Sequence, residues 1–406
     1  MKRLLIFLVC ALFLIPSSNA QVRVAKSANR KITLNISGLR AGRDSASQTF
    51  FQTLEKDLRL SGWFSPTRGS GELRLSGSVE PSGRKLKVTA RVSRSSDQAG
   101  LFAKTYSADS TQARDLAHSV ADEIIEAITG HKGISSTKIA MVGTRSGTKA
   151  KELYLCDANG GNLRQITRDR KIIVGPNWGP KGDSILFTSF LRGFPDVHQI
   201  DLRRSKRTVL TAYPGVNTGG ALSPNGKELA VILSKDGNPD LYIKNPRSKK
   251  EPRRLTATRR ATEASPSWSP DGRHLVYVSD QSGTPQLYII AREGGRPKRI
   301  SSRGSENVAP DWGPNNLITC ASRSGGRYVI AVIHPTSGQT TYLQSGPSDY
   351  HADYEDPSWA PDGRHIVAAR SVNYQSSLYL LDTISDPPVA LFQSGGNWLS
   401  PAWSPK

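Results

Sequence analysis

One short segment of the chain gathers side chains that could bind a hard metal ion. Carboxylate oxygens are the ligands that calcium prefers in proteins. Acidic and imidazole side chains cluster between residues 349 and 356, as Asp349, His351, Asp353, Glu355 and Asp356. The segment lies in a long connection between two repeated units, where polar side chains are ordinarily solvated. We interpret it as a solvated loop and predict no metal ligand.

Two other sequence patterns resemble metal-binding or catalytic motifs. Asp236-Gly-Asn-Pro-Asp240 reads like the opening of a calcium loop, but Leu241 and Arg247 occupy the positions that such a loop gives to Gly and Glu. We therefore interpret it as a hairpin loop. His274 and His365 occupy the same slot in two repeated units, and a position that the architecture repeats is ordinarily structural. With no G-x-S-x-G elbow, H-E-x-x-H or Gly-rich phosphate loop in the sequence, we predict no catalytic residue, no cofactor and no enzyme.

A further set of polar side chains precedes a repeated Pro-x-Trp turn. If Pro-x-Trp forms the innermost strand of each unit, the connection leading into it lies at one mouth of a central channel. Loop residues held by a rigid scaffold are where such proteins bind their partners. The candidate partner-binding residues are Asn217, Thr218, Glu263, Ser265, Asn307, Glu355 and Asp356.

The turn that positions these residues is written six times. Each copy reads close to Pro-x-Trp-Ser-Pro-Asp-Gly, in which Pro presets φ, Asp or Asn bonds its own backbone and Gly accepts a positive φ. The Trp is large enough to fill the wedge between two neighbouring sheets. A period of about 45 residues corresponds to one four-stranded propeller blade. The second proline of each copy is Pro180, Pro224, Pro270, Pro314, Pro361 or Pro405.

The two ends of the repeat array are offset. A strand-like segment, Lys138-Ile-Ala-Met-Val142, precedes the first turn, and no strand follows the last turn at 401–406. Both facts are explained if the last copy supplies the innermost strand of the first blade, which leaves no open sheet edge. The sequence therefore predicts a six-bladed β-propeller over residues 138–406, closed by its C-terminal strand.

The residues before the propeller divide into a signal and a small domain. Lys2 and Arg3, the apolar run 4–15 and the small residues at 18–20 are typical of a secretory signal peptide over 1–20. Alternating and helical periodicities then predict a small α/β domain over 21–130 and a linker over 131–137. Its expected elements are strands near 31–36, 72–79, 85–92 and 101–106 and helices near 45–60 and 110–129.

Charge and cysteine content restrict the partners. The net charge of +21 favours acidic proteins, anionic lipids or wall polymers, and the export signal argues against nucleic acid. No later stretch is long and apolar enough to span a bilayer, so we expect no integral membrane segment after signal cleavage. Cys156 and Cys320 fall on the first and fifth blades, so we predict buried free thiols.

The set of features resembles the TolB family of periplasmic propeller proteins. The resemblance rests on the six turns in order, on the terminal Pro401-Ala-Trp-Ser-Pro405, on Leu58-Arg-Leu-Ser-Gly-Trp-Phe64, and on the segment from Glu123 to Gly130 that runs into the first propeller strand. It implies a periplasmic, monomeric adaptor without catalysis. In such an adaptor the propeller binds a Pal-like peptidoglycan-associated lipoprotein.

The resemblance also implies a second contact, in which the mature N-terminus engages a TolA-like inner-membrane protein. The residues that correspond to that N-terminus are Gln21, Val22, Arg23 and Val24. Such an adaptor would maintain outer-membrane integrity and support cell division. The alternative is a secreted propeller enzyme that acts on a glycan or a peptide, with calcium in the channel as one variant.

Overall fold

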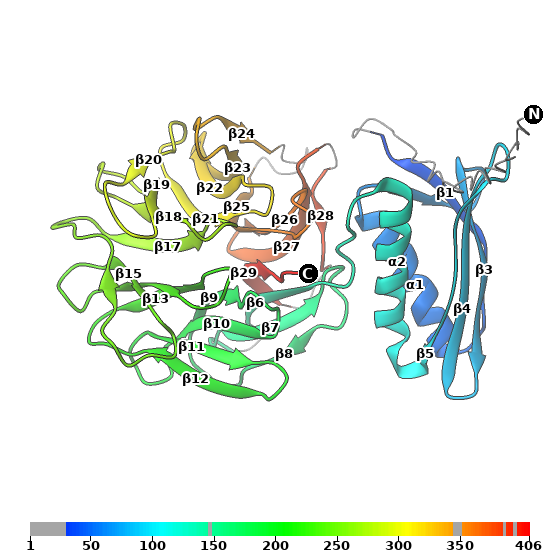
Figure 1. The fold of residues 1–406 in the computed structure, drawn as a ribbon, viewed down its shortest axis with the longest axis horizontal. Helices are drawn as coiled ribbons and strands as arrows, with labels where there is room; N and C mark the ends of the chain where they lie inside the picture. Colours follow the sequence, from blue (N-terminus) through cyan, green and yellow to red (C-terminus); the bar gives the residue numbers. More distant parts are fainter. Residues whose placement is uncertain (1–29, 145–147, 344–350, 385–386, 393–395) are drawn as a thin grey trace, which may run out of the picture.

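A computed structural model describes residues 30–144, 148–343, 351–384, 387–392 and 396–406 (Figure 1). The predicted signal peptide and the candidate N-terminal contact at Gln21–Val24 lie outside these residues. In the described part, no helix is long and apolar enough to cross a membrane. The chain forms an α/β domain followed by a six-bladed β-propeller, as the sequence predicts.

The α/β domain is a five-stranded sheet with two helices on its propeller-facing side (Figure 1). The strand order is β2-β1-β3-β4-β5. Strand β1 is parallel to β2 and β3, and β3, β4 and β5 are antiparallel. The strands are β1 (Ile32–Ala41), β2 (Phe64–Thr67), β3 (Leu73–Ser82), β4 (Lys85–Arg94) and β5 (Gly100–Asp109). The sequence reading missed β2, which is short and contains a proline.

The two helices of this domain begin and end on recognisable residues. Helix α1 (Ser45–Leu60) has the predicted bounds, and the Asp44 side chain caps it by accepting a hydrogen bond from the Ser47 amide. Helix α2 (Ala113–Thr129) follows a single 3₁₀ turn, η1 (Ser110–Gln112), and ends at Gly130, whose φ of 75° is left-handed. The apolar faces of both helices bury against the sheet in one core.

Each propeller blade is a four-stranded antiparallel sheet. Blade 1 has β6 (Lys138–Thr144), β7 (Glu152–Asp157), β8 (Arg164–Gln165) and β29 (Asn397–Trp403), and blade 2 has β9 (Ile173–Trp178), β10 (Ser184–Ser189), β11 (Asp196–Asp201) and β12 (Lys206–Thr211). Blade 3 has β13 (Asn217–Leu222), β14 (Leu229–Leu233), β15 (Asp240–Lys244) and β16 (Arg253–Arg254). Blade 4 has β17 (Glu263–Trp268), β18 (His274–Ser279), β19 (Gln286–Ala291) and β20 (Lys298–Arg299). Blade 5 has β21 (Asn307–Trp312), β22 (Ile318–Ser324), β23 (Arg327–Ile333) and β24 (Thr340–Tyr342), and blade 6 has β25 (Asp353–Trp359), β26 (His365–Val372), β27 (Gln375–Asp382) and β28 (Val389–Ala390).

The C-terminal strand closes the propeller. Strand β29 pairs with β6 in antiparallel register, with Trp403 opposite Ile139 and Ala402 opposite Ala140. The indole Nε1 of Trp403 donates to Thr137 Oγ1 at 2.7 Å. The predicted closure is therefore confirmed. Cys156 and Cys320 lie on blades 1 and 5 as buried free thiols, also as predicted.

Buried charged side chains join the two domains. His118 on α2 contacts the Asp57 carboxylate on α1 through Nδ1 at 2.6 Å and the Asp157 carboxylate on β7 through Nε2 at 3.2 Å. Lys138 Nζ lies 2.7 Å from Asp157, and the Asn159 amide donates to Asp57 at 2.7 Å. Burial would lower the pKa of His118, but its hydrogen bonds to the two carboxylates outweigh burial and raise the pKa to about 9. An imidazolium between two carboxylates therefore bridges the domains.

A second set of contacts reinforces this interface. The Arg364 guanidinium, on blade 6, lies 4.5 Å from the ring centroid of Trp63 in the α/β domain and pairs with Asp382 at 2.5 Å. At the end of the chain, Lys406 Nζ lies 3.1 Å from the Asp122 carboxylate on α2. The C-terminal residues thus bind both the first blade and the helix that precedes the propeller.

Candidate partner-binding channel

The innermost strands of the six blades surround a channel, and each contains a β-bulge. In every bulge two residues of the inner strand face one residue of its neighbour. The first residue of each bulge has a positive φ. We call these residues the bulge ring: Gly175, Gly219, Ser265, Ala309, Asp356 and Ser400.

The backbone of the bulge ring is strained at its non-glycine positions. Ser265, Ala309, Asp356 and Ser400 have φ between 44° and 50°, a conformation that costs on the order of 1–3 kcal/mol for a residue with a Cβ. A glycine would adopt it freely, as Gly175 does. Side chains are therefore retained around the channel despite this cost, which marks the ring as a candidate binding surface.

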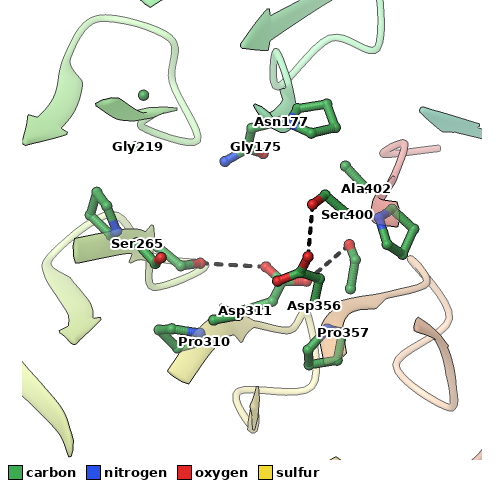
Figure 2. Close-up of a pocket in the computed structure, with 17 residues that line it drawn as sticks. Gly175, Asn177, Gly219, Ser265, Pro310, Asp311, Asp356, Pro357, Ser400 and Ala402 are labelled. Atoms are coloured by element: carbon green, nitrogen blue, oxygen red, sulfur yellow. Dashed lines mark hydrogen bonds between the residues drawn. The ribbon is translucent and has the colours of Figure 1, made fainter. Parts of the chain in front are cut away.

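The bulge ring lines a cavity of about 160 Å³ together with the middle residues of five of the six repeated turns, all except that of blade 3 (Figure 2). Asn177, Ser267, Asp311 and Ser358 are among these middle residues. Inner strands of all six blades contribute, so the lining comes from segments far apart in the sequence. The result is a polar cavity on a rigid scaffold.

Asp311 is the carboxylate held most tightly in the channel. It accepts hydrogen bonds from the Trp359 amide at 2.7 Å, from Ser358 Oγ at 3.2 Å and from Ser267 Oγ at 3.4 Å. Burial raises the pKa of Asp311 even though the three hydrogen bonds oppose the shift. Because blades 4 and 6 both donate to this blade 5 carboxylate, Asp311 links three blades around the channel.

Asp356 provides a second carboxylate, in the bulge ring itself. It accepts a hydrogen bond from Ser400 Oγ at 2.7 Å (Figure 2). Burial raises its pKa, opposed by this hydrogen bond and by the charge of Lys151. The pKa of the adjacent Glu355 is raised by burial and by the charges of Asp356 and Asp353. Carboxylates with raised pKa values favour a partner that brings a cation or hydrogen-bond donors to this mouth.

The structure divides the predicted mouth residues into two groups. Asn217, Glu263 and Asn307 are at most 1% exposed, so the prediction that they are presented at the mouth is wrong. Their side chains bond inward: Asn217 Oδ1 accepts from the Tyr213 amide at 2.8 Å, and Glu263 Oε1 accepts from Ser279 Oγ at 3.1 Å. Each begins an inner strand, where the side chain packs between strands and ties down the preceding loop.

The other four predicted residues lie in the bulge ring or directly beside it. Ser265 and Asp356 belong to the bulge ring, and Thr218 and Glu355 each stand one residue before it. Thr218, Glu355 and Asp356 are partly exposed, and Ser265 is exposed. These four side chains form the part of the predicted set that a partner could reach.

Sequence reasoning missed several channel residues. Ser267, Asp311 and Ser358 are the middle residues of Pro-x-Trp turns, and Ser400 completes the bulge ring. The signal was present in the repeat. Along an inner strand, side chains one and three residues before the tryptophan share a face because strand side chains alternate. The bulge that lies between these positions is not visible from hydrophobic periodicity.

The remaining chemistry candidates do not form a site in the structure. Asp349 lies outside the described residues. Asp353, Glu355 and Asp356 lie on strand β25, so the prediction that the whole acidic segment is a loop is wrong. Asp353 accepts from the backbone of Tyr328, whereas Asp356 faces Ser400. Across the described ranges, no group of three or more His, Cys, Asp or Glu side chains could hold a metal ion.

Two further expectations concern repeated loops and histidines. The Asp236–Asp240 segment joins β14 to β15 as the predicted hairpin loop. His274 and His365 differ in surroundings despite their shared slot. His274 is exposed, whereas His365 is buried with its Nδ1 2.6 Å from Asp362. The shared slot therefore does not give the two rings the same surroundings.

The opposite end of the channel is richer in apolar side chains. A cavity of about 290 Å³ there is lined mainly by tryptophans and prolines of the repeated turns, and Asp311 lines it as well as the first cavity. The lining prolines are Pro180, Pro224, Pro270, Pro314, Pro361 and Pro405. The channel therefore has a polar mouth with Asp356 at the bulge ring and a mouth rich in Trp and Pro at the turns.

Fold and channel together define the class as a six-bladed β-propeller with an N-terminal α/β domain and an open central channel. A family model described as the TolB beta propeller domain matches residues 125–406. The chain belongs to this family.

Curated relatives and a solved structure agree with this assignment. The Tol-Pal system protein TolB of Alcanivorax borkumensis is 35% identical over 142 residues, which cover 34% of this chain and 33% of that protein. The Tol-Pal system protein TolB of Legionella pneumophila (strain Corby) is 29% identical over 195 residues, 43% of this chain and 46% of that protein. The chain thus spans less than half the length of these curated relatives in alignment. The crystal structure of TolB from Acinetobacter baumannii shares the fold, with a TM-score of 0.82 and 24% identity over 94% of this chain and 98% of that one.

Proposed function

We propose that this chain is a periplasmic adaptor of a Tol–Pal-like cell-envelope complex. In this role it binds a Pal-like peptidoglycan-associated lipoprotein and a TolA-like inner-membrane protein, and it helps to maintain outer-membrane integrity and to support cell division. The observation that carries the proposal is the family match over residues 125–406. The names of the relatives, Tol-Pal system protein TolB, support it.

The bulge-ring mouth is the proposed binding surface for the lipoprotein. Its reachable polar side chains are Thr218, Ser265, Glu355 and Asp356. Rigid inner strands hold them, so a partner that inserts a loop into the mouth would lose little free energy to ordering of the propeller. Carboxylates at the mouth suit a loop that carries Lys or Arg.

The remaining assignments complete this proposal. We assign domain limits of 21–130 and 138–406, joined by a linker over 131–137, with a signal peptide over 1–20. The TolA-like partner is assigned to the mature N-terminus at Gln21, Val22, Arg23 and Val24. The adaptor acts as a monomer and needs no catalytic residue or cofactor.

Titration calorimetry tests the lipoprotein contact. The mature protein is titrated with the soluble periplasmic domain of the Pal-like lipoprotein from the same organism. Glu355→Lys should weaken binding at least about ten-fold, because a buried or half-buried charge reversal at an interface costs more than 1.4 kcal/mol. The matched control is Glu293→Lys, whose carboxylate is 76% exposed on the turn between β19 and β20. It should bind like the unaltered protein.

Two results would contradict the proposal. One is an unaltered, folded protein that shows no binding at micromolar concentrations. The other is an equal loss of affinity in both variants, which would mean that net charge and not the mouth determines binding. Deletion of residues 21–24 provides the separate test for the TolA-like partner, and it should leave binding of the lipoprotein domain unchanged.

A further inference from the structure

Apolar side chains are exposed together at one place on blade 2. Phe194 is 72% exposed, Ile172 46% and Leu191 42%. Leu191 and Phe194 lie on the tip of the β10–β11 hairpin, and Ile172 ends the connection from β8 to β9. Isolated exposed apolar residues need no explanation, but a group of them marks a contact with a protein or a membrane.

Backbone and side-chain bonds hold the two loops against each other. The Phe190 amide donates to the Ile172 carbonyl at 3.0 Å. The Asp169 carboxylate accepts from Ser189 Oγ at 3.5 Å and from Arg207 Nη1 at 2.5 Å. The apolar side chains are therefore held on one surface. Because the β8–β9 connection leads into the inner strand, this surface lies on the face that carries the bulge-ring mouth.

Cationic side chains surround these apolar residues. Arg168, Arg170 and Lys171 are exposed on the β8–β9 connection, and Arg192 is exposed on the hairpin tip. Arg192 pairs with the buried Asp196 at 2.8 Å. Among the residues that the structure describes, the other three have no carboxylate partner. We call this set the blade 2 patch: Arg168, Arg170, Lys171, Ile172, Leu191, Arg192 and Phe194.

Nearby acidic groups do not neutralise the patch. Asp169 is engaged by Arg207. Glu152 is only 6% exposed and accepts hydrogen bonds from Thr167 Oγ1 and from the Arg170 amide. The surface charge of the patch is therefore positive, in keeping with the net charge of +21 for the whole chain.

We infer that the blade 2 patch binds directly to the surface of an anionic phospholipid bilayer. Side chains such as Phe and Leu on a projecting hairpin tip can enter the boundary between headgroups and acyl chains, where no complementary pocket is required. Unpaired Arg and Lys side chains beside them meet anionic headgroups, and each such cation adds to the attraction. An acidic protein partner would satisfy the charges but would also need a pocket for the projecting Phe194.

This contact goes beyond the proposed adaptor function. It would hold the polar mouth of the channel close to a membrane surface, with the channel axis turned toward the lipid. The propeller would then encounter a lipid-anchored partner on that surface at a raised effective concentration. The lipid contact itself requires no protein partner, so it can be measured alone.

Vesicle co-sedimentation tests the inference. The mature protein is mixed with vesicles of phosphatidylethanolamine and phosphatidylglycerol, or of phosphatidylcholine alone, at an ionic strength of about 0.15 M. The unaltered protein should partition to the anionic vesicles at least about ten-fold more strongly, as several unpaired cations contribute. The pair Leu191→Ser and Phe194→Ser should lower this partitioning about ten-fold without changing the charge.

Matched variants separate the patch from general basicity. Arg168→Gln with Lys171→Gln removes two charges from the patch and should lower partitioning about ten-fold or more. Arg203→Gln with Arg204→Gln removes two exposed charges from the turn at the other end of the same blade. The apolar control is Val209→Ser with Val389→Ser, since both valines are exposed on outermost strands. Both controls should stay within about two-fold of the unaltered protein.

Three results would overturn the inference. The first is an unaltered protein that does not prefer anionic vesicles. The second is an equal loss in the patch variants and their controls, which would assign binding to net charge. The third is unchanged vesicle binding in patch variants that lose affinity for the soluble lipoprotein domain, which would assign the patch to a protein partner. Failure of the adaptor proposal is separately visible, because its calorimetry contains no lipid.

Discussion

Closure of the propeller by its last strand can be tested by removing the residues that form it. Trp403 is 6% exposed, packs among residues of blades 1 and 6, and donates its indole hydrogen bond to Thr137. Truncation of a buried Trp to Ala costs about 3–5 kcal/mol. We therefore expect Trp403→Ala to lower the free energy of unfolding by about 4 kcal/mol.

Deletion of residues 401–406 should cost more than this single change. It also removes the Ser404 backbone and side-chain bonds to Lys138, at 2.9 Å and 3.0 Å, and the bond from Trp178 Nε1 to the Ala402 carbonyl at 2.9 Å. Each such bond contributes roughly 1 kcal/mol net. The deletion also exposes the edge of β6, which should make the protein aggregate at high concentration.

Urea denaturation followed by far-UV circular dichroism measures these changes. The matched control is Trp312→Ala, since Trp312 is the equivalent residue of blade 5 but is only partly buried, and its indole bonds to Asn316 within its own turn. The control should lose no more than about 2 kcal/mol. A deletion that changes the free energy of unfolding by less than about 1 kcal/mol, or a Trp312→Ala variant as unstable as Trp403→Ala, would refute the closure argument.

Further predictions concern buried ionisable groups and thiols. Because the pKa of His118 is raised to about 9 in the folded state, its stabilising contribution is complete below its ordinary pKa of about 6.5 and is lost as the pH rises toward 9. His118→Asn should therefore cost about 3–5 kcal/mol at pH 6 and should abolish the decline in stability between pH 6.5 and 9, measured by urea denaturation at each pH; a variant that keeps this decline would contradict the assignment. Burial and the adjacent Asp240 raise the pKa of Glu263 to about 7. Ionisation of this group should therefore lower the free energy of unfolding as the pH rises from the ordinary pKa of a glutamate through 7. Glu263→Gln should flatten that slope, and an unchanged slope would contradict the shift. Cys156 and Cys320 are buried free thiols, so a thiol reagent should label them only in denaturant, and fast labelling of the native protein would contradict their burial.

Local chemistry explains why much of the fold could be predicted. The Pro-x-Trp-Ser-Pro-Asp-Gly turn specifies its own backbone, so its repetition gave the blade count and the position of the inner strands. The offset between the first strand at Lys138 and the last turn at Trp403 was enough to predict closure. Helix α1 was likewise predicted with its observed bounds, because its cap and apolar periodicity are both local.

The candidate site was only partly predictable. Asn217, Glu263 and Asn307 read as polar loop residues, yet each begins an inner strand and is buried. Whether a polar side chain points to solvent or packs between strands depends on the bulge that follows it. That bulge changes which side chains share a face without changing the hydrophobic pattern.

The sequence by itself determined the six blades, their order and the α/β domain, since each follows from residues close together in the chain. It determined the closing strand from the offset between the first strand and the last turn of the repeat. Only the tertiary structure brought Asp311 of blade 5 between Ser267 and Ser358 of its neighbours. It also placed His118 between carboxylates of two domains. These contacts between residues distant in sequence depend on how rigid blades and helices are oriented in space. That orientation is set by the sum of many packing contacts, not by any local pattern.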